Sequence, residues 1–329
     1  MTRRVQPATS DLETAYRGVP SLVLGASGFI GSWTARALHG RGANVIVSAR
    51  DAQRVRDAFA PFGWSPRIEV ADLTEPGAVT RLVRTTRPAI VFNLAGYGVD
   101  RSERDPSLMT QLNSRLVAEL CEALAAPFEV SRTGVRLVHS GSAAEYGPVE
   151  GRIVETSDER PIGEYGRTKL EGTRLLQRSC LTSGLNAVVA RLFTVYGPGD
   201  YPSKILNALM RTAKTGEPLE LTGGCQRRNF TYVGDVAEGL LRLGLSAPAP
   251  GEVVHLAGAF VVSVREFAET ACAVLGLDPA LLHFGALPDR EDEMWHGEVD
   301  CARLQALISW APRTGIREGI RRSWEFENA

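Results

Sequence analysis

Short apolar runs alternate with longer, more polar segments over the first 192 residues of the chain. Such runs predict buried strands, and they lie at residues 21–24, 45–47, 68–70, 89–94, 135–139 and 187–192. The segments between them predict helices at residues 29–39, 51–59, 78–83, 108–124 and 165–183. Strands that are apolar on both faces and alternate with helices predict an α/β fold with a Rossmann-type, doubly wound parallel sheet.

The alternation weakens beyond Gly197, where helices are expected near residues 204–214, 234–244 and 263–275, separated by short strands and Gly/Pro loops. We therefore expect three parts. Residues 1–19 form a polar N-terminal leader, and residues 20–195 form an NADP-binding Rossmann domain to which residues 225–257 return. Residues 196–329 form a smaller α/β substrate-binding lobe.

Composition excludes several classes of protein. The 329 residues are 44% hydrophobic and 23% charged, as in an ordinary globular protein. The formal net charge of −1 leaves no basic field for nucleic acid. No apolar run approaches the ~18 residues of a membrane helix, and the first residues lack the apolar core of a secretory signal. The five cysteines and five histidines show no metal-ligand spacing. We expect a cytoplasmic protein with no metal and no nucleic-acid or membrane partner.

A glycine-rich turn joins the first predicted strand to the first predicted helix, and it reads Gly25-Ala26-Ser27-Gly28-Phe29-Ile30-Gly31. Glycine permits a sharp turn, close approach of a pyrophosphate to the backbone, and tight packing of the helix on the sheet. The positive N-terminal end of the helix attracts phosphate. This turn is expected to bind a dinucleotide, the alternative being a plain strand–helix turn.

The charge at the end of the second strand distinguishes the two nicotinamide cofactors. NAD sites usually carry an acid there for the ribose hydroxyl, whereas NADP sites need a cation for the 2′-phosphate. This chain has Arg50, which stands 19 residues beyond Gly31, and its guanidinium can pair with a phosphate. NADP(H) is therefore expected. NAD is the alternative, since Asp51 would take the place of the acid if the end of the strand lay one residue later. Asp72, which follows the third strand with Leu73, either meets the adenine amine or caps a helix.

Tyr165 and Lys169 stand four residues apart, on one face of a predicted helix. An unperturbed tyrosine has a pKa of about 10, and the nearby ammonium of Lys169 is expected to lower the pKa of Tyr165. Lys169 can also hold the nicotinamide ribose. Ser142 follows the fifth strand, where ligands bind in such sheets, and it can donate a hydrogen bond to a substrate carbonyl. Alternatively, Tyr165 and Lys169 form an ordinary pair on the helix surface, and Ser142 is a turn residue or cap.

Together these residues resemble the extended short-chain dehydrogenase/reductases, the nucleotide-sugar epimerase/dehydratase group, from about residue 21 to the C-terminus. The motifs that carry the resemblance are the glycine turn, Asp72-Leu73, Asn93-Leu94-Ala95-Gly96, Asp105-Pro106 with Asn113, Ser142, Tyr165-xxx-Lys169, Arg191-Leu192-Phe193 leading to Val195-Tyr196-Gly197-Pro198-Gly199, Arg228-Asn229-Phe230 with Val233 and Asp235, and Arg290.

The resemblance implies a catalytic triad of Ser142, Tyr165 and Lys169, with Asn113 helping to order the site. It implies that Arg228 and Arg290 bind the diphosphate of a nucleotide sugar, which suits the planar fork of arginine; either arginine is otherwise a surface residue. It also implies a homodimer formed through the helices at 108–124 and 165–183. The cofactor-binding residues it implies are Gly25, Ser27, Gly28, Phe29, Ile30, Gly31, Arg50, Asp72, Leu73, Leu94, Ala95, Gly96, Tyr165 and Lys169.

Three departures from the family pattern narrow the expected reaction. Ala143 and Ala144 follow Ser142, where members that eliminate water carry Asp-Glu, so we do not expect a 4,6-dehydratase. Thr194 replaces the asparagine that contacts the sugar nucleotide in the family. Tyr97 stands among the residues after the fourth strand, where small residues are usual, and is expected to reach the substrate pocket.

The expected function is therefore NADP(H)-dependent reduction of a nucleotide-activated keto-deoxysugar by a dTDP-4-keto-6-deoxyhexose 4-ketoreductase. Hydride reaches the keto carbon while Tyr165 protonates the oxygen. One alternative is a nucleotide-sugar 4-epimerase, which keeps a tightly bound NAD and which Arg50 disfavours. Another is a non-catalytic NADP-binding sensor, which the Tyr165–Lys169 pair disfavours. A third is a reductase of a non-sugar carbonyl compound, which Arg228 and Arg290 disfavour.

Overall fold

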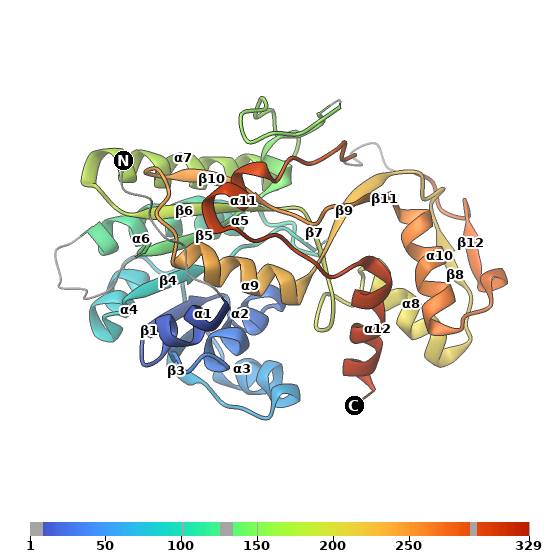
Figure 1. Cartoon of the computed structure of the whole chain (residues 1–329), viewed down its shortest axis with the longest axis horizontal. Helices are drawn as coiled ribbons and strands as arrows, with labels where there is room; N and C mark the ends of the chain where they lie inside the picture. The colour runs from blue at the N-terminus through green and yellow to red at the C-terminus, as the bar shows by residue number, and fades with distance from the viewer. Residues whose placement is uncertain (1–8, 101, 126–133, 150, 290–294, 329) are drawn as a thin grey trace.

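One parallel sheet forms the centre of the molecule (Figure 1). The computed structural model describes residues 9–100, 102–125, 134–149, 151–289 and 295–328. Its seven-stranded sheet has the order β10-β6-β5-β4-β1-β2-β3, with every neighbouring pair parallel. The strands are β1 Pro20–Leu24, β2 Asn44–Ala49, β3 Arg67–Val70, β4 Ile90–Asn93, β5 Leu137–Ser142, β6 Ala187–Leu192 and β10 Glu252–Leu256. The order 3-2-1-4-5-6 is that of the doubly wound dinucleotide-binding fold, so the predicted fold class is confirmed.

Helices cover both faces of this sheet because its strands are apolar on both sides. Val23 of β1 packs with α2, α3 and α9, whereas Leu22 and Leu24 pack with α4, α6 and α7. The first three helices are α2 Phe29–His39, α3 Ala52–Phe59 and α9 Val233–Gly244, and the other three are α4 Ala78–Thr86, α6 Leu116–Ala125 and α7 Glu164–Ser183. In the described part of the chain, no helix is long and apolar enough to cross a membrane.

The helix expected at residues 108–124 is interrupted by a π-helical turn. Helix α5 Pro106–Thr110 leads into η2 Gln111–Arg115, which continues as α6. Turns of this kind are rare and often lie at functional sites. Here the turn carries Asn113, one of the residues that the sequence analysis assigns to the site.

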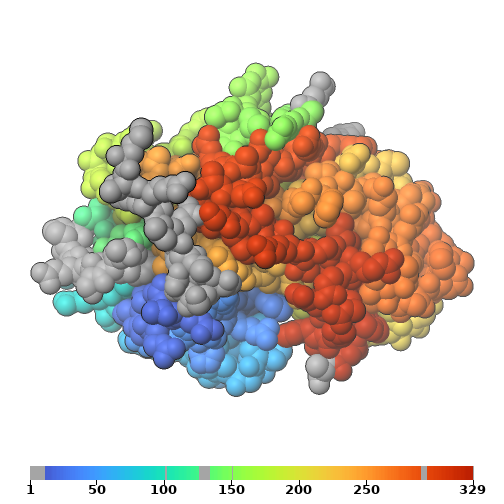
Figure 2. Space-filling view, viewed as in Figure 1, coloured from blue at the N-terminus to red at the C-terminus, as the bar shows by residue number. Residues whose placement is uncertain are grey.

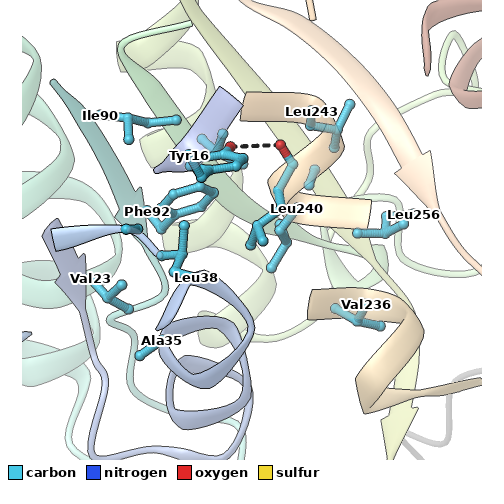
Figure 3. Close-up of a cluster of buried hydrophobic side chains, with 14 of the residues drawn as sticks. Tyr16, Val23, Ala35, Leu38, Ile90, Phe92, Val236, Leu240, Leu243 and Leu256 are labelled. Atoms are coloured by element: carbon cyan, nitrogen blue, oxygen red, sulfur yellow. Dashed lines mark hydrogen bonds between the residues drawn. The ribbon is translucent and has the colours of Figure 1, made fainter. Parts of the chain in front are cut away.

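The polar N-terminal segment contributes to the core, which the sequence analysis did not foresee. Residues Thr9–Tyr16 form α1, and the side chains of Leu12 and Tyr16 are buried. The Tyr16 ring lies near Phe92, and its hydroxyl donates to the Leu241 carbonyl at 2.7 Å (Figure 3). Two apolar positions in a polar segment are too few to reveal a packed face by periodicity.

The smaller lobe is built around two short sheets. Strands β7 Thr194–Tyr196, β9 Arg227–Tyr232 and β11 Val261–Ser263 form one, and β8 Leu219–Leu221 pairs with β12 Leu282–Phe284. Helices α8 Ile205–Thr215, α10 Val264–Leu275 and α12 Ile316–Glu327 pack with them. The remaining elements are η1 Ala60–Phe62, η3 Ala143–Glu145, η4 Pro279–Leu281 and α11 Ala302–Ile308. Figure 1 shows this lobe beside the sheet, in yellow to red.

The C-terminal segment joins the two parts of the molecule. In Figure 2 its surface runs between the first helices of the chain and the smaller lobe. Phe326 of α12 lies 5.6 Å from the Trp33 ring and 5.7 Å from the Phe62 ring. Trp33 also donates its indole N–H to the Pro198 carbonyl at 2.9 Å. These contacts hold the two lobes at the distance that defines the cleft between them.

Candidate functional site

A cleft of about 620 Å³ lies between the carboxyl ends of the parallel strands and the smaller lobe. In a doubly wound sheet this is the edge where ligands bind. The cleft brings together every residue that the sequence analysis assigns to the cofactor, from the turn after β1 to Tyr165 and Lys169 on α7. Tyr97, Ser142 and Thr194, assigned to the substrate, line it as well.

The glycine turn has the geometry of a phosphate cradle. Gly25 has a φ of +74°, and a Cβ there would lie 2.6 Å from the Leu94 carbonyl oxygen. A Cβ at Gly31 would lie 2.2 Å from the Gly25 oxygen, so α2 can approach β1 only with glycine at this position. Gly28 is the N-cap of α2 and has no side chain that could cap the helix. The first N–H groups of α2 therefore border the cleft, where an anion can accept from them.

Two arginines line the part of the cleft that follows β2, and Asp72, which follows β3, lies near Arg50. Arg50 and Arg54 both border the cleft. The carboxylate of Asp51 accepts the Gln53 N–H at 2.7 Å as the N-cap of α3 and does not line the cleft. Ser48 borders the cleft, and its buried hydroxyl has no hydrogen-bond partner among the described residues. Ser48 could not be singled out from the sequence, because a serine in a buried strand carries no distinctive signal.

Asp72 lines the cleft and also fixes the turn that follows β3. Its carboxylate accepts the Thr74 N–H at 2.9 Å and the Thr74 hydroxyl at 2.7 Å. Burial opposes ionisation, but the Thr74 hydrogen bonds and the charge of Arg50 lower the pKa of Asp72. The carboxylate is therefore ionised and held by a local turn, but it is not the N-cap of the following helix, because α4 is capped at Gly77.

Ser142 and Tyr165 meet where β5 and α7 converge. Ser142 is the last residue of β5, and its Oγ accepts the Ala144 N–H at 3.2 Å. Gly166 lets α7 approach this turn, since a Cβ there would lie 2.3 Å from the Ala144 oxygen. Lys169, one turn further along α7, is buried and donates to the Ser140 carbonyl at 2.5 Å. The three residues of the expected triad therefore border one end of the cleft.

The electrostatics of this group differ from the expectation. Burial raises the pKa of Tyr165 to about 12, against the opposing effect of a hydrogen bond with Ser142. Burial lowers the pKa of Lys169 to about 8, although the nearby Glu145 carboxylate raises it. The expectation that Lys169 lowers the pKa of Tyr165 is wrong for this geometry, in which the ammonium contacts the backbone of Ser140. Tyr165 keeps its proton at neutral pH, as a proton donor must.

Asn113 lies behind the cleft and does not line it. Its amide oxygen accepts the Tyr97 N–H at 3.0 Å, and its amide nitrogen donates to the Tyr97 carbonyl and the Thr168 hydroxyl at 2.8 and 3.0 Å. The side chain thus ties the loop after β4 to α7. Gly172 permits this contact, because a Cβ there would lie 2.1 Å from the Asn113 carbonyl oxygen.

The structure describes only one of the two arginines that are expected to bind a diphosphate. Arg228 lies on β9, two residues before Phe230, which lines the cleft. Side chains two apart on a strand share a face, so Arg228 stands on the cleft side of β9. The cleft-lining residues nevertheless do not include it. Arg290 lies outside the described residues.

Two loops meet where Glu103, Tyr201 and Lys204 line the cleft, and the sequence did not single out most of their residues. The Tyr201 hydroxyl donates to Glu103 at 3.1 Å, and Lys204 donates to the Val99 carbonyl at 3.0 Å. Burial raises the pKa of Asp200, which also borders the cleft, to about 7. Only Lys204 offered a signal, as one of three lysines in the chain.

Comparison with known proteins agrees with this geometry. The model of the NAD dependent epimerase/dehydratase family matches residues 21–265. The dTDP-6-deoxy-L-talose 4-dehydrogenase (NAD(P)(+)) of Kitasatospora kifunensis is 28% identical over 319 residues, covering 93% of this chain and 95% of that protein. The dTDP-glucose 4,6-dehydratase of Streptomyces griseus is 29% identical over 313 residues, covering 91% of each.

Solved structures show the same fold. MoeE5 in complex with UDP-glucose and NAD superimposes with a TM-score of 0.79 at 29% identity, covering 94% of this chain and 98% of that chain. The UDP-glucuronic acid 4-epimerase of Bacillus cereus has a TM-score of 0.81 at 23% identity, with the same coverage. The family model spans most of the chain and the cleft carries the family's motifs. The chain therefore belongs to the NAD dependent epimerase/dehydratase family, as an enzyme of the extended short-chain dehydrogenase/reductase type.

Proposed function

We propose that this enzyme reduces the keto group of a nucleotide-activated keto-deoxysugar with NADPH, as a dTDP-4-keto-6-deoxyhexose 4-ketoreductase. The observation that carries the proposal is the adenosine end of the cleft, where Arg50 stands and Asp51 is engaged as a helix cap. A reductase must bind and release its cofactor in each turnover, and NADPH is the usual donor for reductive biosynthesis.

The residues of the cleft fit NADP(H). Gly28 leaves the start of α2 open to the pyrophosphate, and Arg50 and Arg54 supply cations for a 2′-phosphate. The unpartnered hydroxyl of Ser48 offers a further hydrogen bond there. When bound, NADPH supplies the hydride for the keto carbon. Tyr165 and Lys169 then border the nicotinamide half of the cofactor in this proposal.

The side chains of the triad have separate tasks in this proposal. The Ser142 Oγ accepts the Ala144 N–H, so its own O–H can donate to the oxygen of the substrate carbonyl. Tyr165 gives its phenolic proton to that oxygen as the carbonyl becomes an alcohol. Lys169 holds the ribose hydroxyls of the cofactor. Proton transfer from a positioned acid contributes about 10²–10⁴-fold to the rate.

Ala143 and Ala144 argue against dehydration, although several relatives are named as 4,6-dehydratases. Both methyl side chains lack the acid and base that elimination of water requires. The K. kifunensis relative is named as a 4-dehydrogenase that uses NAD(P)(+). A 4-dehydrogenase and a 4-ketoreductase catalyse one reaction in opposite directions, and this supports a redox outcome at the sugar carbon.

The remaining assignments belong to the same proposal. Tyr97 and Thr194 contact the sugar, and Arg228 and Arg290 bind the diphosphate. Residues 20–195 serve the cofactor together with the part of 225–257 that returns to the parallel sheet, α9 and β10, whereas β9 lies in the smaller lobe, which serves the substrate. The enzyme is a homodimer that pairs through α5, α6 and α7. Size-exclusion chromatography with light scattering measures the mass that tests the dimer.

The decisive experiment follows NADPH absorbance after the protein is mixed with dTDP-4-keto-6-deoxyglucose, with NADH in parallel. Stoichiometric oxidation of NADPH, faster than that of NADH, is the expected result. Conversion of the sugar to an isomer without net oxidation, by protein that retains NAD through gel filtration, would instead identify a 4-epimerase. The solved neighbours that contain NAD and epimerase substrates make that the second candidate.

A further inference from the structure

We propose that Glu145 is a positioning residue of the active site, whose buried carboxylate holds the Ser142 turn against the helix that carries Tyr165 and Lys169. The inference rests on the proposed function, because it assigns Glu145 a part in the same reaction. Glu145 does not line the cleft and therefore acts only through the residues that it holds.

The Glu145 carboxylate is fully buried and makes three hydrogen bonds. One oxygen, Oε1, accepts the backbone N–H of Ser142 at 2.6 Å. The other, Oε2, accepts the Thr173 hydroxyl at 2.9 Å and an Nη2 hydrogen of Arg191 at 2.5 Å. A buried carboxylate is tolerated only when it is paired and hydrogen-bonded, and these donors meet that need.

Each of these donors belongs to a different element of the site. Ser142 ends β5, Thr173 lies on α7, and Arg191 lies on β6 beside Gly141 of β5. Thr173 follows Lys169 by four residues, so the two side chains share a face of α7. A Cβ at Gly141 would lie 2.8 Å from Oε1 of Glu145, so this approach requires a glycine. One carboxylate therefore sets the distance between the Ser142 turn and α7.

Arg191 binds two carboxylates, and comparing them shows that Glu145 does more than pair with a positive charge. Its guanidinium also binds Glu159 at 2.7 Å and lies 4.3 Å from the centre of the Tyr146 ring. Glu159 is partly exposed, and in the described part of the chain it forms ion pairs with Arg191 and with Arg174 of α7. The two carboxylates thus share one cation, but only Glu145 reaches the residues of the active site.

The charge of Glu145 also acts on both catalytic groups. It raises the pKa of Lys169, against the burial that lowers it to about 8, and it raises the pKa of Tyr165. The other ionisable groups that face them are Glu103, which acts on Tyr165, and His139, whose own pKa burial and Lys169 hold well below its usual value. Glu145 thus favours a cationic lysine and a protonated tyrosine, the two states that reduction needs.

The first test compares Glu145→Gln with Glu159→Gln in the ketoreductase assay. Misplacement of a catalytic group by about 1 Å costs about 10²-fold in rate, so kcat of Glu145→Gln is expected to fall about 10²-fold, a larger change than that in the KM for NADPH. Glu159→Gln, the matched control, is expected to keep the parental kcat. Parental kcat in Glu145→Gln, or an equal loss in both variants, would overturn the proposal.

The second test needs no sugar, so its failure is distinct from failure of the proposed function. The chain has three lysines, and isotope labelling of lysine allows each side chain to be titrated by NMR, with Lys204 and Lys214 as internal references. The titration midpoint of Lys169 is expected to fall in Glu145→Gln and to stay unchanged in Glu159→Gln. An unchanged midpoint in folded Glu145→Gln would contradict the proposal.

A third variant covers the case in which Glu145→Gln does not fold. Thr173→Val removes one donor to the carboxylate, keeps the shape of the side chain, and leaves Arg191 in place. We expect its kcat to fall by about 10-fold, since one of three hydrogen bonds that hold the carboxylate is lost. A Thr173→Val enzyme with parental kcat would overturn the positioning role.

Discussion

At the residue scale, the chemistry of the cleft depends on a few side chains whose surroundings decide their charge. Tyr165 and Lys169 are four residues apart, yet their pKa values shift in opposite directions in the structure. Burial raises the pKa of one and lowers the pKa of the other. The spacing could be found in the sequence, but the sign of the shift on Tyr165 could not. That sign depends on which groups lie around the phenol.

Replacement of Arg50 by alanine is expected to weaken the binding of NADPH but not that of NADH. A hydrogen-bonded charge contact contributes about 1.5–3 kcal/mol, so the KM for NADPH should rise about 10- to 100-fold while the KM for NADH changes little. Steady-state kinetics with both cofactors measures the effect. Arg56→Ala is the matched control, because Arg56 lies on α3, bonds to Gln53 and does not line the cleft. Equal losses for NADH and NADPH in Arg50→Ala would argue against 2′-phosphate recognition.

Replacement of Tyr165 by phenylalanine is expected to remove the proton donor and to preserve the fold. The ring packs beside Gly98, where a Cβ would lie 3.0 Å from the Tyr165 Cδ2, and phenylalanine keeps that shape. We expect kcat to fall by about 10²–10⁴-fold with NADPH affinity retained, as measured by turnover and by fluorescence titration of the cofactor. Turnover within a few-fold of the parent would remove Tyr165 from the mechanism.

At the element scale, close backbone contacts decide where the helices meet. The sequence predicted most of the helices and strands, because their apolar patterns are long or are bounded by glycine and proline. It did not predict α1 or the π-helical turn η2. The packed face of α1 rests on two side chains, and the π-helical turn is fixed by the contact between Asn113 and α7.

Helix α1 is expected to contribute measurably to stability. Tyr16→Phe removes the hydroxyl that donates to the Leu241 carbonyl and should lower the free energy of unfolding by about 1 kcal/mol, the usual net value of a buried hydrogen bond. Urea denaturation followed by circular dichroism measures the loss. Thr14→Ala, on the exposed side of α1, should leave stability unchanged. A Tyr16→Phe protein as stable as the parent would mean that water or another group satisfies the carbonyl.

The contact between η2 and α7 is expected to require glycine. A Cβ at Gly172 would lie 2.1 Å from the backbone oxygen of Asn113, so Gly172→Ala must force the elements apart at a cost of about 1–3 kcal/mol. Thermal unfolding should show the loss, and kcat should fall because α7 carries Tyr165. Gly163→Ala is the control, since nothing lies within 4 Å of a Cβ there. Equal stability of the two variants would show that the chain relaxes around the added methyl group.

At the scale of the whole molecule, the cleft exists because two lobes are held together by the C-terminal segment and by loops that meet across it. The rings of Trp33, Phe62 and Phe326 join helices from opposite ends of the chain. Glu103 accepts the N–H groups of Gly98 and Val99 and the hydroxyl of Tyr201. The substrate end of the cleft therefore depends on contacts between distant segments.

Replacement of Tyr201 by phenylalanine is expected to weaken the binding of the sugar and not that of the cofactor. Loss of a hydrogen bond worth about 1 kcal/mol across the cleft should raise the KM for the sugar about 5-fold and leave the KM for NADPH unchanged, because neither Tyr201 nor Glu103 is among the residues assigned to the cofactor. Steady-state kinetics with each substrate varied in turn separates the two constants. A rise confined to the KM for NADPH would show that the two loops serve the cofactor.

The order of strands and helices, the glycine turn, and the residue types of the cleft follow from the sequence alone, because they depend on local pattern and on chemistry at fixed spacing. The tertiary structure decided the rest. It buried Tyr16, engaged Asp51 as a cap, joined the loops of Glu103 and Tyr201, and set Glu145 between Ser142, Thr173 and Arg191. Each of these depends on contacts between residues far apart in the chain, and the energy of such a contact is defined only when the packed elements fix the distance and exclude water.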